Sequence, residues 1–109
     1  MPASSSHTLS KSLLDLRPEH LKLVQQILQK HVPHCTVWAF GSRVSGNAKP
    51  TSDLDLALME KGALTVKILD ALKEAFEEST MPIKVDLVDY RSIDSSFQEI
   101  INRRKVIIQ

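Results

Sequence analysis

The 109-residue chain suits one small domain with a single core, and its formal net charge of +1 gives no reason to expect non-specific binding along a nucleic-acid backbone. Its one cysteine, Cys35, excludes an internal disulfide. No apolar run approaches the roughly 18 residues that would span a bilayer, and the first residues lack the apolar segment of a secretory signal. We therefore expect a cytoplasmic protein that does not enter membranes.

The N-terminal segment is rich in serine and has few apolar residues, so residues 1–16 are predicted to form a flexible tail ahead of one domain, 17–109. Pro18 suits the first turn of a helix, where its missing N–H is not needed. Leu21, Val24 and Leu28 then recur at helical spacing, which predicts an amphipathic helix over residues 18–30.

Residues 35–40 are β-branched and aromatic enough to form a mostly buried first strand, which ends at Gly41 and Ser42. A short helical turn over 43–45, closed by Gly46, and a polar loop over 47–52 are expected to follow. A metal site at His31, His34 and Cys35 is the alternative for this region, but their spacing fits no common zinc pattern.

The second predicted strand covers residues 52–59 and alternates acidic and apolar side chains. Because strand side chains alternate between faces, the leucines should point into a core. Asp53, Asp55 and Ala57 should point to the opposite face. The strand therefore predicts two carboxylates side by side on one face.

A helix over residues 64–78 is predicted from one apolar face, which includes Leu72 and Phe76. A third strand follows over 83–88, with Asp86 in the middle of an apolar run and on the face opposite to Val85.

Ser92 or Asp94 could cap a last helix, whose apolar stripe would comprise Phe97, Ile100 and Ile101. The apolar end, 106–108, would either extend the sheet or contact a partner. The order of helices and strands predicts a two-layered α/β (α+β) domain with a small sheet.

Two carboxylates two residues apart on one strand repel each other. On an exposed face of a sheet this repulsion costs little, whereas in a cleft it needs a cation. Hard oxygen ligands suit Mg²⁺ or Mn²⁺. If the second and third strands pair, then Asp53, Asp55 and Asp86 could bracket one or two metal ions. Such a cluster is typical of metal-assisted phosphoryl or nucleotidyl transfer.

Phosphate ligands would need hydrogen-bond donors near these carboxylates. Gly41 allows close backbone approach, and free N–H groups at a helix start bind anions. Ser42 adds a hydroxyl, and Arg43 could make a bidentate phosphate contact.

The segment GSRVSGNAKPTSDLDLAL, with Gly-Ser about ten residues before Asp-x-Asp, resembles the signature of the DNA polymerase β-like nucleotidyltransferase superfamily. The chain looks most like its minimal nucleotidyltransferase (MNT) proteins, and the resemblance covers most of 18–109. It implies the polymerase β-like fold, with a small mixed sheet of three to four strands packed against helices.

By this resemblance Gly41 and Ser42 would bind the nucleotide triphosphate, beside the phosphate contact expected from Arg43. Asp53 and Asp55 would bind Mg²⁺, with two ions expected. Asp86 would be the third carboxylate, assisting the acceptor hydroxyl, with Asp89 as a weaker alternative. The family further implies ATP as substrate and a small helical HEPN-type partner encoded nearby. In such pairs the MNT protein acts as antitoxin by transferring AMP to a tyrosine of a toxic RNase.

A different class of function is a non-catalytic nucleotide-binding subunit that scaffolds or neutralises the helical partner by direct contact. Transfer to a small molecule is disfavoured because the related enzymes carry an additional domain. A polymerase is disfavoured because the sequence shows no basic groove or aromatic platform for nucleic acid.

Overall fold

The computed structural model describes residues 14–60 and 64–109, which form one four-stranded sheet with helices on both of its faces. The strands are β1 (Thr36–Phe40), β2 (Leu54–Met59), β3 (Val85–Asp89) and β4 (Val106–Ile107). Their order in the sheet is β3-β2-β1-β4. The β1 strand pairs antiparallel with β2 and β4, whereas β2 pairs parallel with β3. This confirms the predicted small mixed sheet.

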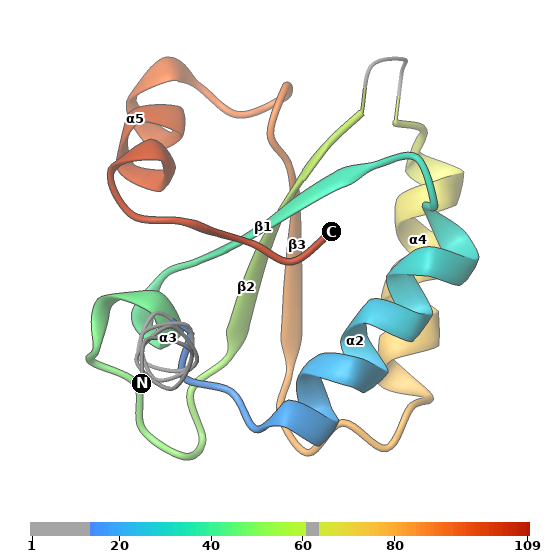
Figure 1. The fold of residues 1–109 in the computed structure, drawn as a ribbon. Helices are drawn as coiled ribbons and strands as arrows, with labels where there is room; N and C mark the ends of the chain where they lie inside the picture. Colours follow the sequence, from blue (N-terminus) through green and yellow to red (C-terminus); the bar gives the residue numbers. More distant parts are fainter. Residues whose placement is uncertain (1–13, 61–63) are drawn as a thin grey trace, which may run out of the picture.

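Helices α2 (Pro18–His31) and α4 (Val66–Glu77) lie side by side on one face of the sheet (Figure 1). They form the main core with the inward side chains of β2, and Leu54, Leu56 and Leu58 are all fully buried, as the alternation predicted. Thr65 begins α4 by accepting a hydrogen bond from the N–H of Ile68.

Helix α5 (Ser95–Arg103) covers part of the opposite face, where Ile101 packs with Phe40 and Ala57 in a second, smaller cluster. Ala57 was predicted on the face that carries the carboxylates, and this helix buries it completely. Of the two predicted caps, Asp94 is the one used, and its carboxylate accepts from the N–H of Phe97 at 2.8 Å. Ile100 was predicted in the apolar stripe of this helix, but it is 59% exposed.

The N-terminal end of the predicted domain differs from expectation, whereas the C-terminal end follows one of the two predicted alternatives. Most of the predicted tail, 1–13, lies outside the described residues, but Leu14 is only 6% exposed and belongs to the main core. The packed domain therefore begins before residue 17. At the other end the apolar segment does join the sheet, because β4 pairs with β1. None of the described helices is long and apolar enough to cross a membrane.

Cys35 is buried at the start of β1, and burial followed by the negative charge of Glu60 raises the pKa of its thiol to about 11. The reactive form of cysteine is the thiolate, so we expect this thiol to react slowly. At pH 8 a disulfide reagent such as Ellman's should modify the folded protein at least about 100-fold more slowly than the protein in denaturant. Equal rates in the two states would contradict the burial of Cys35.

Candidate active site

Gly41 joins β1 to the short helix α3 (Ser42–Ser45) in a backbone conformation that side chains rarely adopt, with φ 82° and ψ −154°. The amide groups of Val44 and Ser45 bond back to the Gly41 carbonyl, so those of Ser42 and Arg43 come before the first bond of the helix. Gly46 closes α3 in the left-handed region, as predicted.

The Gly41 backbone lies directly against the carboxylate of Asp55. A Cβ atom added to Gly41 would overlap Oδ2 of Asp55 and lie 3.2 Å from its Cγ. The Gly-Ser turn and the Asp-x-Asp segment, separated along the chain by a loop, therefore meet at one point. Glycine is needed here for two reasons: its backbone has a positive φ, and a side chain would collide with Asp55.

The parallel register of β2 and β3 places Asp55 directly opposite Asp86. Asp53 immediately precedes β2. Burial raises the pKa of Asp55, and the charges of Asp86 and then Asp53 raise it further. The strand pairing on which the predicted three-carboxylate site depended is thus present, and Asp55 interacts electrostatically with each of the other two carboxylates.

The donor set suits a hard cation, since all three groups offer carboxylate oxygens. Even so, within 14–60 and 64–109 no three acidic, histidine or cysteine side chains are gathered in an arrangement ready to hold a metal ion. Asp86 instead pairs with Lys84, Oδ1 to Nζ at 3.3 Å, in a largely exposed ion pair. The backbone register places Asp55 and Asp86 on one face of the sheet, and Asp53 immediately precedes the same strand as Asp55.

Asp89, the weaker alternative for the third carboxylate, lies opposite Leu58 and farther along the strand. Its two oxygens accept hydrogen bonds from the N–H of Arg91 and the hydroxyl of Ser92. This is the geometry of a turn-forming aspartate, and Asp86 is the better placed of the two.

Arg43 differs most from the predicted bidentate phosphate contact, because its guanidinium is already engaged by other parts of the chain. It is 7% exposed, and its guanidinium donates only to backbone carbonyls. The acceptors are the oxygens of Asp15 at 2.8 Å, Ser52 at 3.0 Å, Pro50 at 3.1 Å and Lys49 at 3.4 Å.

These hydrogen bonds give Arg43 a structural role. They join three segments: α3, the residues that lead into α2, and the loop whose Ser52 directly precedes Asp53. The N–H of Asp15 returns a bond to the Arg43 carbonyl at 2.7 Å. Sequence reasoning missed this because nothing local distinguishes a buried arginine from a ligand-binding one.

Replacing Arg43 with methionine should lower the free energy of unfolding by about 3 kcal/mol, since it leaves several buried carbonyls without donors. Urea denaturation measures the change. Arg103→Met is the matched control, because Arg103 only pairs with Glu99 at the surface, and it should alter stability by no more than about 0.5 kcal/mol. Similar effects of the two substitutions would contradict the role assigned to Arg43.

One wall of the site is formed by α5. The ring of Phe97 meets that of Phe40 edge-on, with centroids 5.8 Å apart, and Phe40 is the β1 residue paired with Asp55. The carboxylate face is therefore bounded by α3 at one end and by the aromatic side of α5 at the other.

The chain resembles known proteins in sequence and in fold. The chain is 51% identical over 96 residues to "Probable protein adenylyltransferase MntA" of Haemophilus influenzae (strain ATCC 51907 / DSM 11121 / KW20 / Rd), covering 88% of this chain and 84% of the relative.

Two solved structures share the fold at low sequence identity. One is a toxin–antitoxin complex with AMP-PNP, with TM-score 0.70, 22% identity, and coverage of 82% of this chain and 72% of that chain. The other is a tri-AMPylated Shewanella oneidensis HEPN toxin in complex with an MNT antitoxin, with TM-score 0.61, 19% identity, and coverage of 86% and 72%.

The family model described as "Polymerase beta, Nucleotidyltransferase" matches residues 22–109, which include the Gly-Ser turn, the Asp-x-Asp segment and the Asp86 strand. The chain therefore belongs to the polymerase β nucleotidyltransferase family.

Proposed function

We propose that this protein is an Mg²⁺-dependent protein adenylyltransferase that transfers AMP from ATP to a small helical HEPN-type partner encoded nearby, and that it acts as the antitoxin of the pair. The observation that carries the proposal is the position of Asp55, whose carboxylate contacts Gly41 on one side and which lies opposite Asp86 on the other. The cytoplasm, where ATP and such partners occur, is the proposed location.

The relatives support the choice of acceptor. The Haemophilus protein is named as a protein adenylyltransferase, and the acceptor in the Shewanella complex is an AMPylated HEPN toxin. The described residues form one sheet with its covering helices. An acceptor supplied by a second protein suits a domain of this size.

Each site residue has a role in this proposal. Gly41 lets the triphosphate approach the backbone, where Ser42 offers its hydroxyl and the amides at the start of α3 offer N–H donors. Asp53 and Asp55, with Asp86, would hold two Mg²⁺ ions or, alternatively, Mn²⁺. When bound, such ions neutralise charge on the attacking and leaving oxygens of an in-line displacement.

Asp86 is the residue proposed to act on the acceptor. Its carboxylate takes the proton of the acceptor hydroxyl, whose oxygen forms a bond to the α-phosphorus of ATP. The bond from that phosphorus to the bridging oxygen breaks, and pyrophosphate leaves. Asp86 lies on the edge strand, opposite Asp55 and away from the Gly-Ser turn on β1, so nucleotide and acceptor would approach from different sides.

Incubation with α-labelled ATP, Mg²⁺ and the purified partner tests the proposal. The wild type should label the partner, and a variant carrying Asp53→Asn and Asp55→Asn should not. Asp70→Asn, which changes an exposed carboxylate of α4, should label it as the wild type does. Failure of the wild type to label the partner, or equal labelling by the double variant, would count against adenylyl transfer.

The second candidate is a non-catalytic subunit that binds and neutralises or scaffolds the partner by contact alone. The favouring observation is the pair of exposed apolar side chains near the C-terminus, Ile100 at 59% and Ile107 at 66% exposure. Full neutralisation of the toxic partner by the double aspartate variant would favour this function, whereas loss of neutralisation would favour catalysis.

A further inference from the structure

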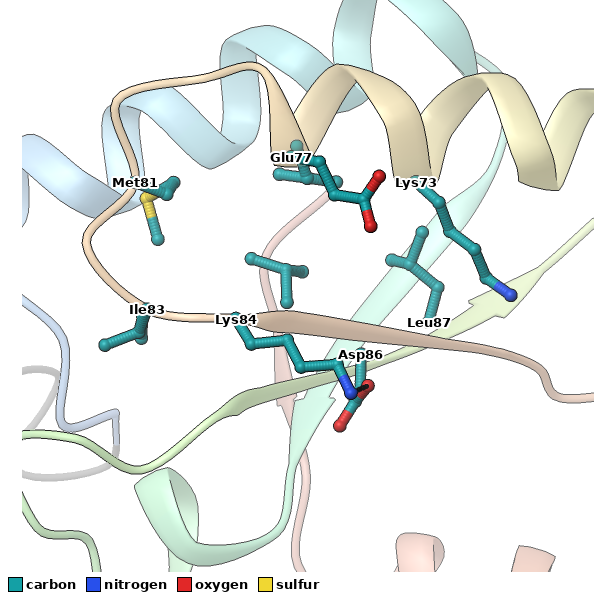
Figure 2. A pocket seen from close by; sticks show the side chains of 9 residues that line it. Lys73, Glu77, Met81, Ile83, Lys84, Asp86 and Leu87 are labelled. Carbon is teal, nitrogen blue, oxygen red and sulfur yellow. Dashed lines mark ion pairs between the residues drawn. The ribbon is translucent and has the colours of Figure 1, made fainter.

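The outer side of β3 carries a groove beside the proposed nucleotide site. The groove has a volume of about 440 Å³ and lies between α4 and β3. We call it the β3 edge groove. Figure 2 shows Lys73 and Glu77 of α4 along one side of the groove. Asp86 of β3 and Lys84, which directly precedes β3, lie along the other side. Asp86 thus borders both the groove and the carboxylate cluster.

The backbone of β3 offers hydrogen-bonding groups along this groove, because β3 is the last strand of the described sheet at that side. The N–H of Leu54 bonds to the carbonyl of Lys84, and the N–H of Tyr90 bonds to the carbonyl of Leu58. Even-numbered residues of β3 therefore turn their backbone groups toward β2. By alternation, Val85 and Leu87 turn theirs outward.

The side chains along the groove are divided between its two walls. Phe76, Met81 and Leu87 provide apolar surface beneath α4. Asp86 points to the opposite side of the strand, toward the carboxylate face, where Lys84 pairs with it (Figure 2). An extended segment added to β3 would therefore place alternate side chains against the apolar wall and beside Asp86.

We propose that the β3 edge groove binds the segment of the partner protein that carries the acceptor hydroxyl, as an added strand antiparallel to β3. The residue opposite Asp86 would form a non-hydrogen-bonded pair, the closer of the two antiparallel pair types, because the backbone groups of Asp86 face β2. Its hydroxyl lies beside the Asp86 carboxylate, and its two neighbours pack against Phe76, Met81 and Leu87. This inference rests on the proposed function and names the place of its acceptor.

The open edge identifies the occupant as polypeptide. Main-chain hydrogen bonds to an edge strand, with pockets for alternate side chains, are a recurring mode of peptide recognition. The groove also continues to the carboxylate proposed to receive the acceptor proton. The Lys84–Asp86 ion pair at the junction is mostly exposed, so an arriving segment can displace it at little cost.

Filling the groove tests the proposal. Glu77→Trp places a large side chain on its α4 side, and Asp70→Trp places the same side chain on an exposed site of α4 that does not line it. Glu77→Trp should raise KM for the partner by about tenfold or more, and binding of a fluorescent ATP analogue should stay within about twofold of wild type. Asp70→Trp should leave both unchanged.

A photo-crosslinking residue provides a readout that is independent of transfer. Installed in place of Glu77, a benzophenone amino acid should attach to the partner segment that contains the labelled residue, and the same group in place of Asp70 should not. Equal KM values for the two tryptophan variants, or crosslinks absent from position 77, would overturn the groove assignment. If the position-77 variant crosslinked to the partner but the wild type transferred no label, the proposed function would fail and the docking site would stand.

Discussion

Replacing Asp55 with asparagine is expected to lower adenylyl transfer by about 1000-fold or more. The carboxylate is the member of the cluster that contacts Gly41 and lies opposite Asp86. In the proposed mechanism Asp55 is an ion ligand, so its loss would remove several kcal/mol of charge stabilisation, and each 1.36 kcal/mol corresponds to tenfold in rate. Asparagine has nearly the same shape, so packing against Gly41 should be kept.

The same substitution should make the metal-free protein more stable at neutral pH. Burial and the neighbouring carboxylates raise the pKa of Asp55 in the folded state, so the native protein holds this proton more tightly than the unfolded chain does. Wild-type stability therefore falls as pH rises from the unfolded pKa through the raised folded pKa. The Asp55→Asn variant has no such ionisation, so its Tm should exceed that of the wild type at pH values above the raised folded pKa. Below the unfolded pKa the difference in Tm should disappear.

Thermal unfolding with and without Mg²⁺ separates the two effects. Added Mg²⁺ should raise the Tm of the wild type, because ligands stabilise the state that binds them, and should raise that of the variant little. Asp70→Asn serves as the control for removal of a negative charge. An Asp55→Asn variant with full transfer, or with a lower metal-free Tm than wild type at neutral pH, would contradict the role given to this carboxylate.

Replacing Gly41 with alanine should impair both folding and transfer. Its φ of 82° and ψ of −154° lie in a region that is essentially restricted to glycine, which costs alanine about 1–3 kcal/mol. The new methyl group would also overlap Oδ2 of Asp55, so the carboxylate or the turn must move. We expect transfer to fall by about 100-fold or more, since small displacements of catalytic groups have effects of this size.

Gly46→Ala is the matched control for backbone strain. Gly46 also has a positive φ, 86°, but a Cβ there would meet no atom within 4 Å. This substitution should cost about 1 kcal/mol in unfolding free energy and leave transfer within about twofold of wild type. Chemical denaturation and initial rates measure both quantities. Equal loss of transfer in the two alanine variants would show that strain, and not contact with Asp55, explains the need for Gly41.

Local patterns were sufficient to predict most helices and strands, because burial of one face imposes a period on each. The leucines of β2 and the apolar face of α4 are buried as their spacing required. The prediction failed at Ile100. Its spacing fits the apolar stripe of α5, but its side chain is 59% exposed because the described chain does not cover that side of the helix. Periodicity identifies a potential face, and the number of neighbours that cover it depends on the rest of the chain.

Several features of the site were also determined by the sequence. The Gly-Ser turn after the first strand and the Asp-x-Asp segment of the second are local sequence features. The sequence alone therefore predicted which residues are present and that both aspartates face the same side. The predicted roles of Asp53, Asp55, Asp86, Gly41 and Ser42 in metal and nucleotide binding remain predictions for the experiments above.

Only the tertiary structure decided which of these residues meet. The pairing of Asp55 with Asp86 depends on the register of two strands that are separated by α4, and the contact of Gly41 with Asp55 depends on the pairing of β1 with β2. Arg43 shows the reason most clearly. Its charge is evident in the sequence, but its hydrogen-bond acceptors come from segments as far away as Asp15, and such long-range contacts are set by packing of the whole chain.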